Sequence, residues 1–157
     1  MSVENVKKYL EQFGLDGKVR EFEQSSATVE LAAQAAGVEP GKIAKTLSFK
    51  VEDSAILIVA AGDARIDNKK YKERFGVKAK MLTPQEVVDY TGHQIGGVCP
   101  FDLADDRVKT YLDESMKRFD TMLPAAGSDN SCVVLTLEEL ERASRASGWV
   151  DVCKLPE

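Results

Sequence analysis

Apolar residues recur at the spacing of an α-helix in several stretches of this chain, and each stretch is bounded by residues that begin or end helices. The predicted helices are one with Val3, Val6, Leu10 and Phe13 on one face, between Ser2 and Gly14; the alanine-rich VELAAQAA, between Thr28 and Gly37; a basic helix between Asp67 and Gly76; a helix opening at Thr83-Pro84-Gln85-Glu86; and a helix from Thr136 to about Ala146. Thr83 and Glu86 have the spacing of a capping box, and the same pattern recurs at Thr136.

Alternating and continuous apolar runs predict the strands. The segment KTLSFKV (45–51) alternates, which indicates a half-buried strand, whereas AILIVAAG (55–62) is nearly all apolar and indicates a central one. Further strands are predicted at 19–23, 78–82, 107–112, 121–126, 131–135 and 149–152, with a hairpin turn at 127–130. We find no repeat or linker, so we expect one domain over residues 1–157, of the α/β (α+β) class, with a mixed sheet surrounded by helices.

Composition fits a protein with its own core. The chain has 157 residues, of which 43% are hydrophobic and 30% charged, enough to bury a core without disulfides. The N-terminus lacks the apolar stretch of a secretory signal, and no run reaches the ~18 apolar residues of a membrane span. Three widely separated cysteines and a single histidine, His93, do not form a metal-binding pattern. We therefore expect a cytoplasmic protein without a metal site and without contact with a membrane.

Charge is unevenly distributed along the chain. The net charge is −5, which argues against a protein that coats duplex DNA electrostatically. Residues 65–80, however, hold seven basic and two acidic side chains, a local balance of +5. Two interpretations remain open for this stretch: a solvated helix face, or a phosphate-facing patch that includes Lys69, Lys70 and Lys72.

Two further features could carry chemistry. The loop Gly96-Gly97-Val98-Cys99-Pro100-Phe101 combines paired glycines, which let a ligand approach the main chain, with a proline that fixes the exit. Its exposed N–H groups could bind a carbonyl, phosphate or ribose oxygen, although an ordinary turn has the same composition. Lys45 begins an apolar strand, where its ammonium could bind a phosphate or polarise a carbonyl, or simply be solvated.

Cys99 could act as a nucleophile only with an activating partner. His93 lies six residues upstream, but a lone histidine after a helix-ending glycine is more typical of a surface or capping position. We therefore rank a Cys/His hydrolase low.

Taken together and in order, these segments resemble the YbaK family, the free-standing relatives of the editing domain of bacterial prolyl-tRNA synthetases. The matching features are the alanine-rich helix before Gly37, the Lys45-Thr46-Leu47 strand start, the AILIVAAG strand, the Thr83-Pro84 helix start, the loop at 96–101, Asp113-Glu114-Ser115, Ala126-Gly127-Ser128 and the final LEEL helix. The likeness runs from about residue 20 to the C-terminus.

The resemblance implies a curved, partly closed mixed sheet with helices around it, and trans-editing of mischarged tRNA by ester hydrolysis. The expected substrates are alanyl- or cysteinyl-tRNA(Pro), with no metal or organic cofactor; prolyl-tRNA synthetase is a second expected partner. Lys45 is the expected catalytic residue, and Lys69, Lys70 and Lys72 are the expected tRNA-facing residues. The expected substrate-binding residues are Thr46, Gly96, Gly97, Val98, Cys99, Pro100, Gly127 and Ser128.

This chain also departs from the family pattern. Many relatives have a tyrosine and a histidine where this chain has Arg20 and Glu23-Gln24, and a glycine where it has Asp102. These differences leave the rejected amino acid open, because small pockets separate single methylenes only by roughly 10 to 200-fold. A non-catalytic module that binds tRNA or a synthetase is the alternative function.

Overall fold

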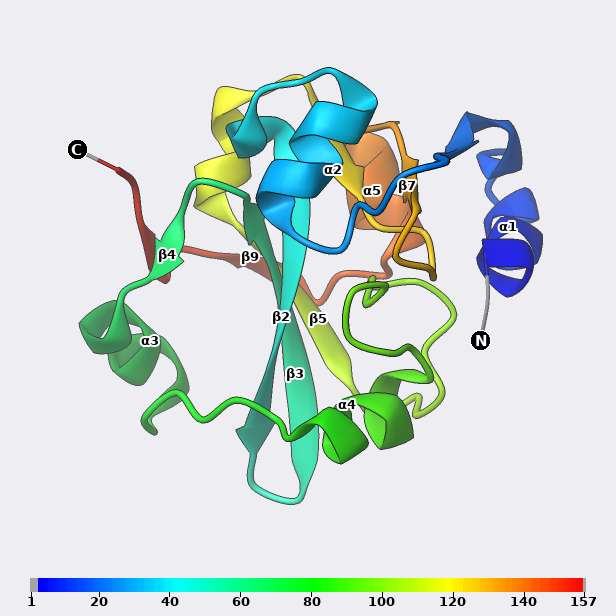
Figure 1. Ribbon diagram of the computed structural model, residues 1–157. Coiled ribbons are helices and arrows are strands. Elements are labelled where there is room, and N and C mark those ends of the chain that lie inside the picture. The colour runs from blue at the N-terminus through cyan, green and yellow to red at the C-terminus, as the bar shows by residue number, and fades with distance from the viewer. Residues whose placement is uncertain (1–2, 157) are drawn as a thin grey trace.

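A curled mixed sheet of six strands, in the order β8-β6-β2-β3-β5-β9, forms the centre of the molecule (Figure 1). The computed structural model describes residues 3–156. The strands are β1 (Val19–Glu21), β2 (Ile43–Val51), β3 (Ser54–Ala61), β4 (Arg65–Ile66), β5 (Lys109–Asp113), β6 (Thr121–Pro124), β7 (Ser131–Val133), β8 (Leu135–Thr136), β9 (Gly148–Val150) and β10 (Cys153–Lys154). The expected fold class, a curved mixed sheet with helices around it, is confirmed.

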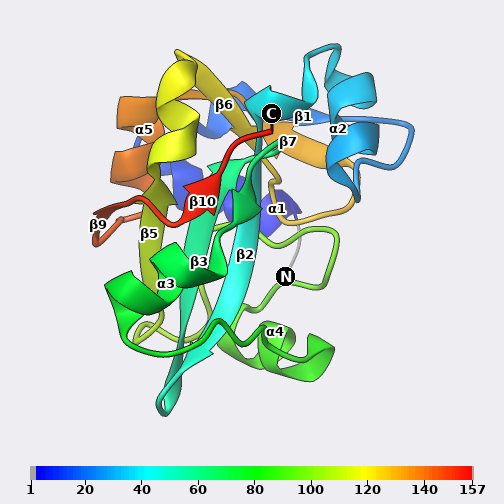
Figure 2. The same cartoon turned by 90° about the vertical axis from the view of Figure 1, so that its left-hand side faces the viewer.

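The sheet is built on one hairpin. β2 and β3 are antiparallel, β6 runs parallel to β2, and β5 and β9 continue the sheet in parallel beyond β3. β8 pairs antiparallel with β6, and two small antiparallel ribbons, β1-β7 and β4-β10, lie outside this sheet (Figure 2). β3 is central as predicted, because every residue from Ala55 to Ala61 is buried.

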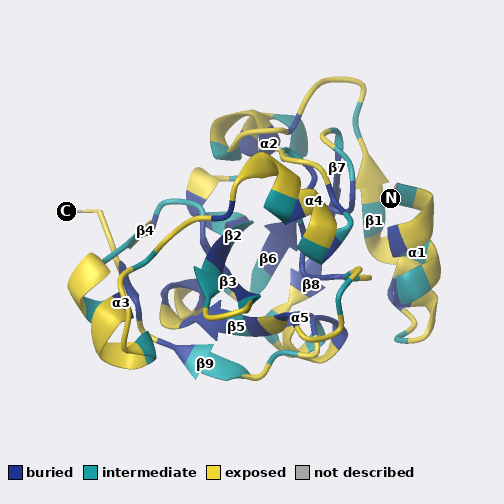
Figure 3. Ribbon diagram, turned by 90° about the horizontal axis from the view of Figure 1, so that it is seen from below, coloured by how far each residue is buried: buried dark blue, intermediate teal, exposed yellow. Residues whose placement is uncertain are grey.

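The helices lie around the sheet, each with an exposed face turned outward (Figure 3). They are α1 (Val3–Glu11), α2 (Val29–Ala36), α3 (Asn68–Phe75), α4 (Pro84–Thr91) and α5 (Leu137–Ala143), with short 3₁₀ turns η1 (Asp16–Lys18), η2 (Pro40–Lys42) and η3 (Glu114–Arg118). The side chains of Thr28, Asp67, Thr83 and Thr136 cap α2, α3, α4 and α5 as predicted, with complete capping boxes at Thr83 and Thr136. The expected cap Ser2 lies outside the described residues. None of the helices in residues 3–156 has the length and apolar character needed to cross a membrane.

The two faces of β2 have different neighbours. Phe49 packs on Tyr71 of α3, with ring centroids 5.1 Å apart, and Tyr71 stacks on Phe75 at 4.9 Å. These contacts hold α3 against one face of β2. Because side chains alternate along a strand, Thr46 and Ser48 point away from α3.

The strand predicted at 78–82 is wrong. This segment crosses the edge of β2 with only one bridge, between Met81 and Phe49, and then turns into α4 at the Thr83 cap. The strand predicted at 131–135 divides into β7 and β8, which pair with different partners, and the one at 149–152 ends at Val150. The last predicted helix ends at Ala143 rather than near Ala146, and β4 has no counterpart in the prediction.

Candidate functional site

A cavity of about 260 Å³ opens beside β2. Its walls come from the start of α2, from β2, from the segment entering α4, from residues 95–98 and from the ends of β6 and β7. In Figure 1 these elements surround β2 from above, below and one side. The cavity therefore collects segments that are up to about a hundred residues apart in the chain.

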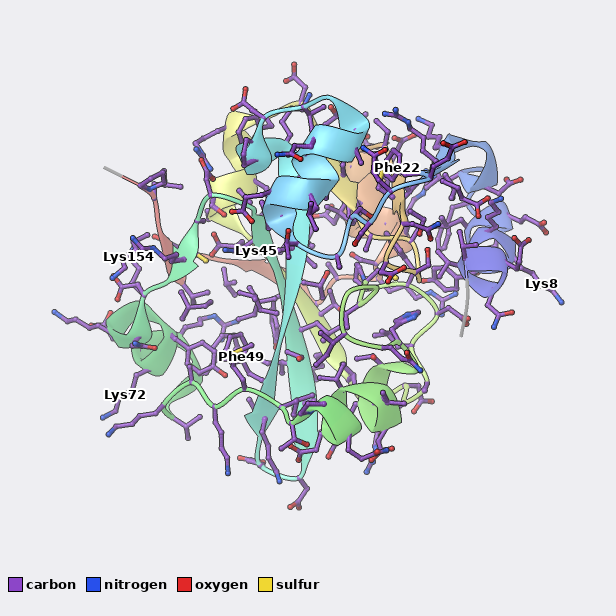
Figure 4. The ribbon with its side chains drawn as sticks, in the orientation of Figure 1. Lys8, Phe22, Lys45, Phe49, Lys72 and Lys154 are labelled. Atoms are coloured by element: carbon purple, nitrogen blue, oxygen red, sulfur yellow. The ribbon has the colours of Figure 1, made fainter. Side chains whose placement is uncertain are left out.

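Lys45 lines this cavity at the start of β2 and is half-buried. Its Nζ donates a hydrogen bond to the main-chain oxygen of Ala64, on the β4 side of the strand (Figure 4). Burial lowers the pKa of the Lys45 ammonium from its ordinary value. The nearby Asp63 carboxylate is occupied by Arg118, at 2.6 and 3.0 Å.

The charge of Lys45 is therefore not neutralised. Within residues 3–156 no carboxylate lies at ion-pair distance from its Nζ. An ammonium that is partly shielded from water and bonded only to a neutral carbonyl keeps most of its field for an incoming anion. The position suits a phosphate or a developing oxyanion.

The residues of the loop predicted to bind substrate, 96–100, do not all face the same cavity. Gly96 and Val98 line the cavity, and Gly96 has a φ of +98°, which explains its glycine. Gly97 instead faces the turn at 127–128, with Gly127 and Ser128, around a second hollow of about 360 Å³. A Cβ at Gly97 would lie 2.9 Å from the Ser128 nitrogen, so the two loops touch main chain to main chain.

The other two loop residues lie elsewhere. Cys99 is fully buried beneath the loop, and Pro100 lines a separate hollow on the side of Tyr9 and Arg145. The structure thus brings Lys45, Thr46, Gly96 and Val98 to one cavity. Gly97, in the same loop, instead packs against the main chain of Gly127 and Ser128.

His93 and Cys99 form a buried pair, so the expectation of a surface histidine is wrong. The His93 Nε2 lies 3.5 Å from the Cys99 Sγ and donates to the main-chain oxygen of Phe101 at 2.7 Å. Burial raises the pKa of the Cys99 thiol to about 12 and lowers the pKa of His93. The nitrogen facing the thiol carries its proton, and neither group reaches the cavity. This geometry does not make a nucleophile and base.

The basic residues of α3 have different roles. Lys70 pairs with Asp151 at 3.1 Å and also donates to the Cys153 carbonyl, so it ties α3 to the C-terminal segment. Lys69 and Lys72 line a surface hollow with Lys78. Of the three lysines predicted to face tRNA, Lys70 is thus held in an ion pair, whereas Lys69 and Lys72 lie at the hollow.

Two hydroxyl groups at the cavity are unpartnered in the described chain. Ser26, before α2, and Thr46, on β2, both line the cavity, and each has a buried oxygen without a hydrogen-bond partner. Ser26 was not predicted, because nothing in its local sequence distinguishes it from other loop serines. Met81 and Ile95, which are 61% and 66% exposed beside the cavity, were not predicted either. Residues 3–156 contain no group of three or more His, Cys, Asp or Glu that could hold a metal ion.

Comparison with known proteins identifies the family. Residues 23–143 match the family described as the aminoacyl-tRNA editing domain. This chain belongs to that family. The editing domain so defined includes Lys45, the 96–100 loop and the 127–128 turn, and the resemblance found in the sequence is confirmed.

Several known proteins are similar to this chain in sequence. An uncharacterized protein of Bacillus subtilis (strain 168), YwhH, is 56% identical over 155 residues, 98% of each chain. The proline-tRNA ligase of Thermosipho melanesiensis is 28% identical over 145 residues, 90% of this chain, and the chain spans about a quarter (25%) of that ligase.

Solved structures agree with the fold of the editing domain. A protein proposed to be a trans-editing enzyme for prolyl-tRNA synthetase superposes with a TM-score of 0.87 at 33% identity, covering 97% of this chain and 96% of the other. A second, described as hypothetical, gives a TM-score of 0.83 at 25% identity, covering 95% of this chain and 99% of its own.

Proposed function

We propose that this protein hydrolyses the ester of mischarged tRNA in trans, with alanyl- or cysteinyl-tRNA(Pro) as substrate. The observation that carries this proposal is that Lys45, whose Nζ has no carboxylate at ion-pair distance within residues 3–156, lines a small cavity in an aminoacyl-tRNA editing domain. The cavity volume of about 260 Å³ is below the ~300–1,000 Å³ of sites for drug-sized ligands. A small aminoacyl group suits such a space.

The chemistry requires little from the protein beyond position and charge. Water adds to the ester carbonyl carbon, the bond from that carbon to the ribose oxygen breaks, and the ribose oxygen takes the proton that the water loses. An ester to a ribose hydroxyl is already activated, so orientation and charge stabilisation can supply most of the acceleration. Lys45 stabilises the terminal phosphate or the developing oxyanion, and main-chain groups of the 96–100 loop hold the terminal ribose. We expect the activity to survive removal of divalent metal by a chelator.

The relatives support the choice of tRNA. The matching region of a proline-tRNA ligase lies within a longer chain, which favours tRNA(Pro) as the substrate and the synthetase as a partner. Lys69 and Lys72, which line one hollow on α3, would contact the tRNA backbone. Figure 4 shows Lys72 on the same side of β2 as Lys45.

The deciding experiment measures release of amino acid from tRNA(Pro) charged with alanine, cysteine or proline, and from seryl- and threonyl-tRNA. Wild type should release alanine or cysteine selectively, and Lys45→Ala should lose on the order of 100-fold or more in kcat/KM. Lys50→Ala is the matched control, because Lys50 lies on the same strand and forms only a partly exposed pair with Glu86 at 3.3 Å.

Each outcome has a definite meaning. If Lys45→Ala matches wild type in both hydrolysis and tRNA affinity, the role of Lys45 is wrong. If wild type binds these tRNAs without releasing any amino acid, the non-catalytic module is the correct function.

A further inference from the structure

The outer edge of β2 is interrupted where it borders the cavity. On that edge β6 pairs with Ile43 and Ala44, and its ladder stops at Pro124. Pairing resumes at Ser48, whose carbonyl accepts from Leu82, and at Lys50, which donates to Lys80. Across residues 3–156 no strand continues the ladder between these two contacts.

Thr46 presents its main chain to this gap. Residues two apart in a strand direct their N–H and C=O groups to the same edge. Ser48 and Lys50 direct theirs outward, and the ladder with β3 occupies the other edge, so the N–H and C=O of Thr46 both face the cavity.

Two side-chain hydroxyl groups beside the gap also lack hydrogen-bond partners. The Thr46 Oγ1 is buried and unpartnered, and so is the Oγ of Ser26, a residue only 8% exposed that lines the same cavity. Buried polar groups in native structures are nearly always paired, and these two unpaired hydroxyl groups at a single cavity favour a polar ligand.

We propose that the main chain of Thr46 binds the aminoacyl ester as a one-residue strand, an inference that rests on the proposed deacylase function. An α-amino ester carries a donor nitrogen and an acceptor carbonyl separated by one carbon, the same arrangement as a residue in a β-ladder. Its ammonium donates to the Thr46 carbonyl oxygen, and the Thr46 N–H donates to the ester carbonyl oxygen. That N–H then stabilises the charge that develops on this oxygen when water adds.

This arrangement separates two kinds of recognition. The contacts to Thr46 are common to every α-amino ester, whereas the substrate side chain meets the cavity walls. Selectivity between alanine, cysteine and proline then comes from the walls, and proline, with its nitrogen in a ring, has one fewer N–H to offer.

Thr46→Pro tests the proposal directly. Proline removes the N–H but no bond to β3, because this N–H faces the outer edge, where strands tolerate proline. With the substrate that wild type hydrolyses, Thr46→Pro should lose on the order of 100 to 1,000-fold in kcat/KM, as for loss of one oxyanion donor. Thr46→Val, which keeps the N–H and loses only the hydroxyl, should lose less than about tenfold, the level of a single methylene-sized change in a pocket.

If Thr46→Pro does not fold, two other measurements still test the role of the Thr46 N–H. An α-hydroxy acid at position 46 replaces the N–H by an ester oxygen without a ring, and should reproduce the loss. Amide hydrogen exchange of the free protein should show Thr46 exchanging faster than Lys45 and Leu47, whose N–H groups face β3.

The outcomes distinguish the two proposals. Equal hydrolysis by wild type and Thr46→Pro overturns the role of Thr46 and leaves the deacylase function standing. A Thr46 amide as protected as its neighbours also overturns it, independently of any activity. Absence of hydrolysis by wild type on every charged tRNA ends the proposed function, and this inference with it.

Discussion

Replacing Gly97 by alanine should destabilise the protein through a single contact. Gly97 is not among the residues with positive φ, so alanine meets no backbone strain there. Its Cβ would, however, lie 2.9 Å from the nitrogen of Ser128 and 3.0 Å from the carbonyl carbon of Gly127, against an ordinary contact of 3.4–4 Å. Because both atoms belong to the main chain, no side-chain rotation relieves the overlap, and the loops must separate by several tenths of an ångström.

Two opposing effects set the expected change in the free energy of unfolding of Gly97→Ala. Overpacking costs about 1–3 kcal/mol, and the loss of glycine's freedom in the unfolded chain offsets about 0.4–1 kcal/mol. We expect a net loss of about 1–2 kcal/mol, which at about 2–4 °C per kcal/mol for a chain of this size lowers Tm by roughly 2–8 °C. Urea unfolding and thermal unfolding both measure it.

Gly17→Ala is the matched control. Nothing lies within 4 Å of a Cβ at Gly17, and its φ is not positive, so this variant should be as stable as wild type or slightly more stable. If Gly97→Ala unfolds at or above the wild-type midpoint, the contact between the two loops is not as tight as described, and the support of the cavity by the 127–128 turn is wrong.

Two further predictions concern pH and salt. Burial lowers the pKa of His93, so the unfolded chain takes up its proton first, and stability should fall as the pH drops below about 6.5. The difference in unfolding free energy between wild type and His93→Gln should shrink from pH 7.5 to pH 5, and a constant difference would contradict a neutral, buried His93. The double variant Lys69→Ala/Lys72→Ala should bind tRNA with a shallower slope of log K against log salt concentration. The slope should change by about 1.4–1.8, because each lost phosphate contact accounts for about 0.7–0.9. Lys8→Ala, on α1 at the far side of the molecule (Figure 4), should keep the wild-type slope, and an equal change in both would place the tRNA elsewhere.

The features predicted correctly from the sequence depend on neighbouring residues. A cap such as Thr83 bonds within four positions, so its pattern is visible in the chain itself. Asp102 has a φ of +53°, in the left-handed region that glycine adopts without strain and that aspartate tolerates better than most residues.

The features that were missed depend on distant segments. The opening at Thr46 exists because β6 stops at Pro124 while residues 80–82 begin pairing at Ser48, and neither limit can be read from the β2 sequence. His93 is buried because the 96–100 loop folds back and offers the Phe101 carbonyl. The predicted strand at 78–82 failed for a related reason, since its apolar alternation is real but only one bridge to β2 forms.

The interrupted edge of β2 also bears on solubility at high concentration. An unpaired strand edge is a template for intermolecular β-pairing, the first step of many aggregates. Here the opening spans only residues 45–47 and is closed at one end by β6 and at the other by the 80–82 segment. An invading strand is usually five or six residues long, so it finds too short a stretch to add to. The enclosure of this short stretch therefore also protects the β2 edge from pairing with other polypeptide chains.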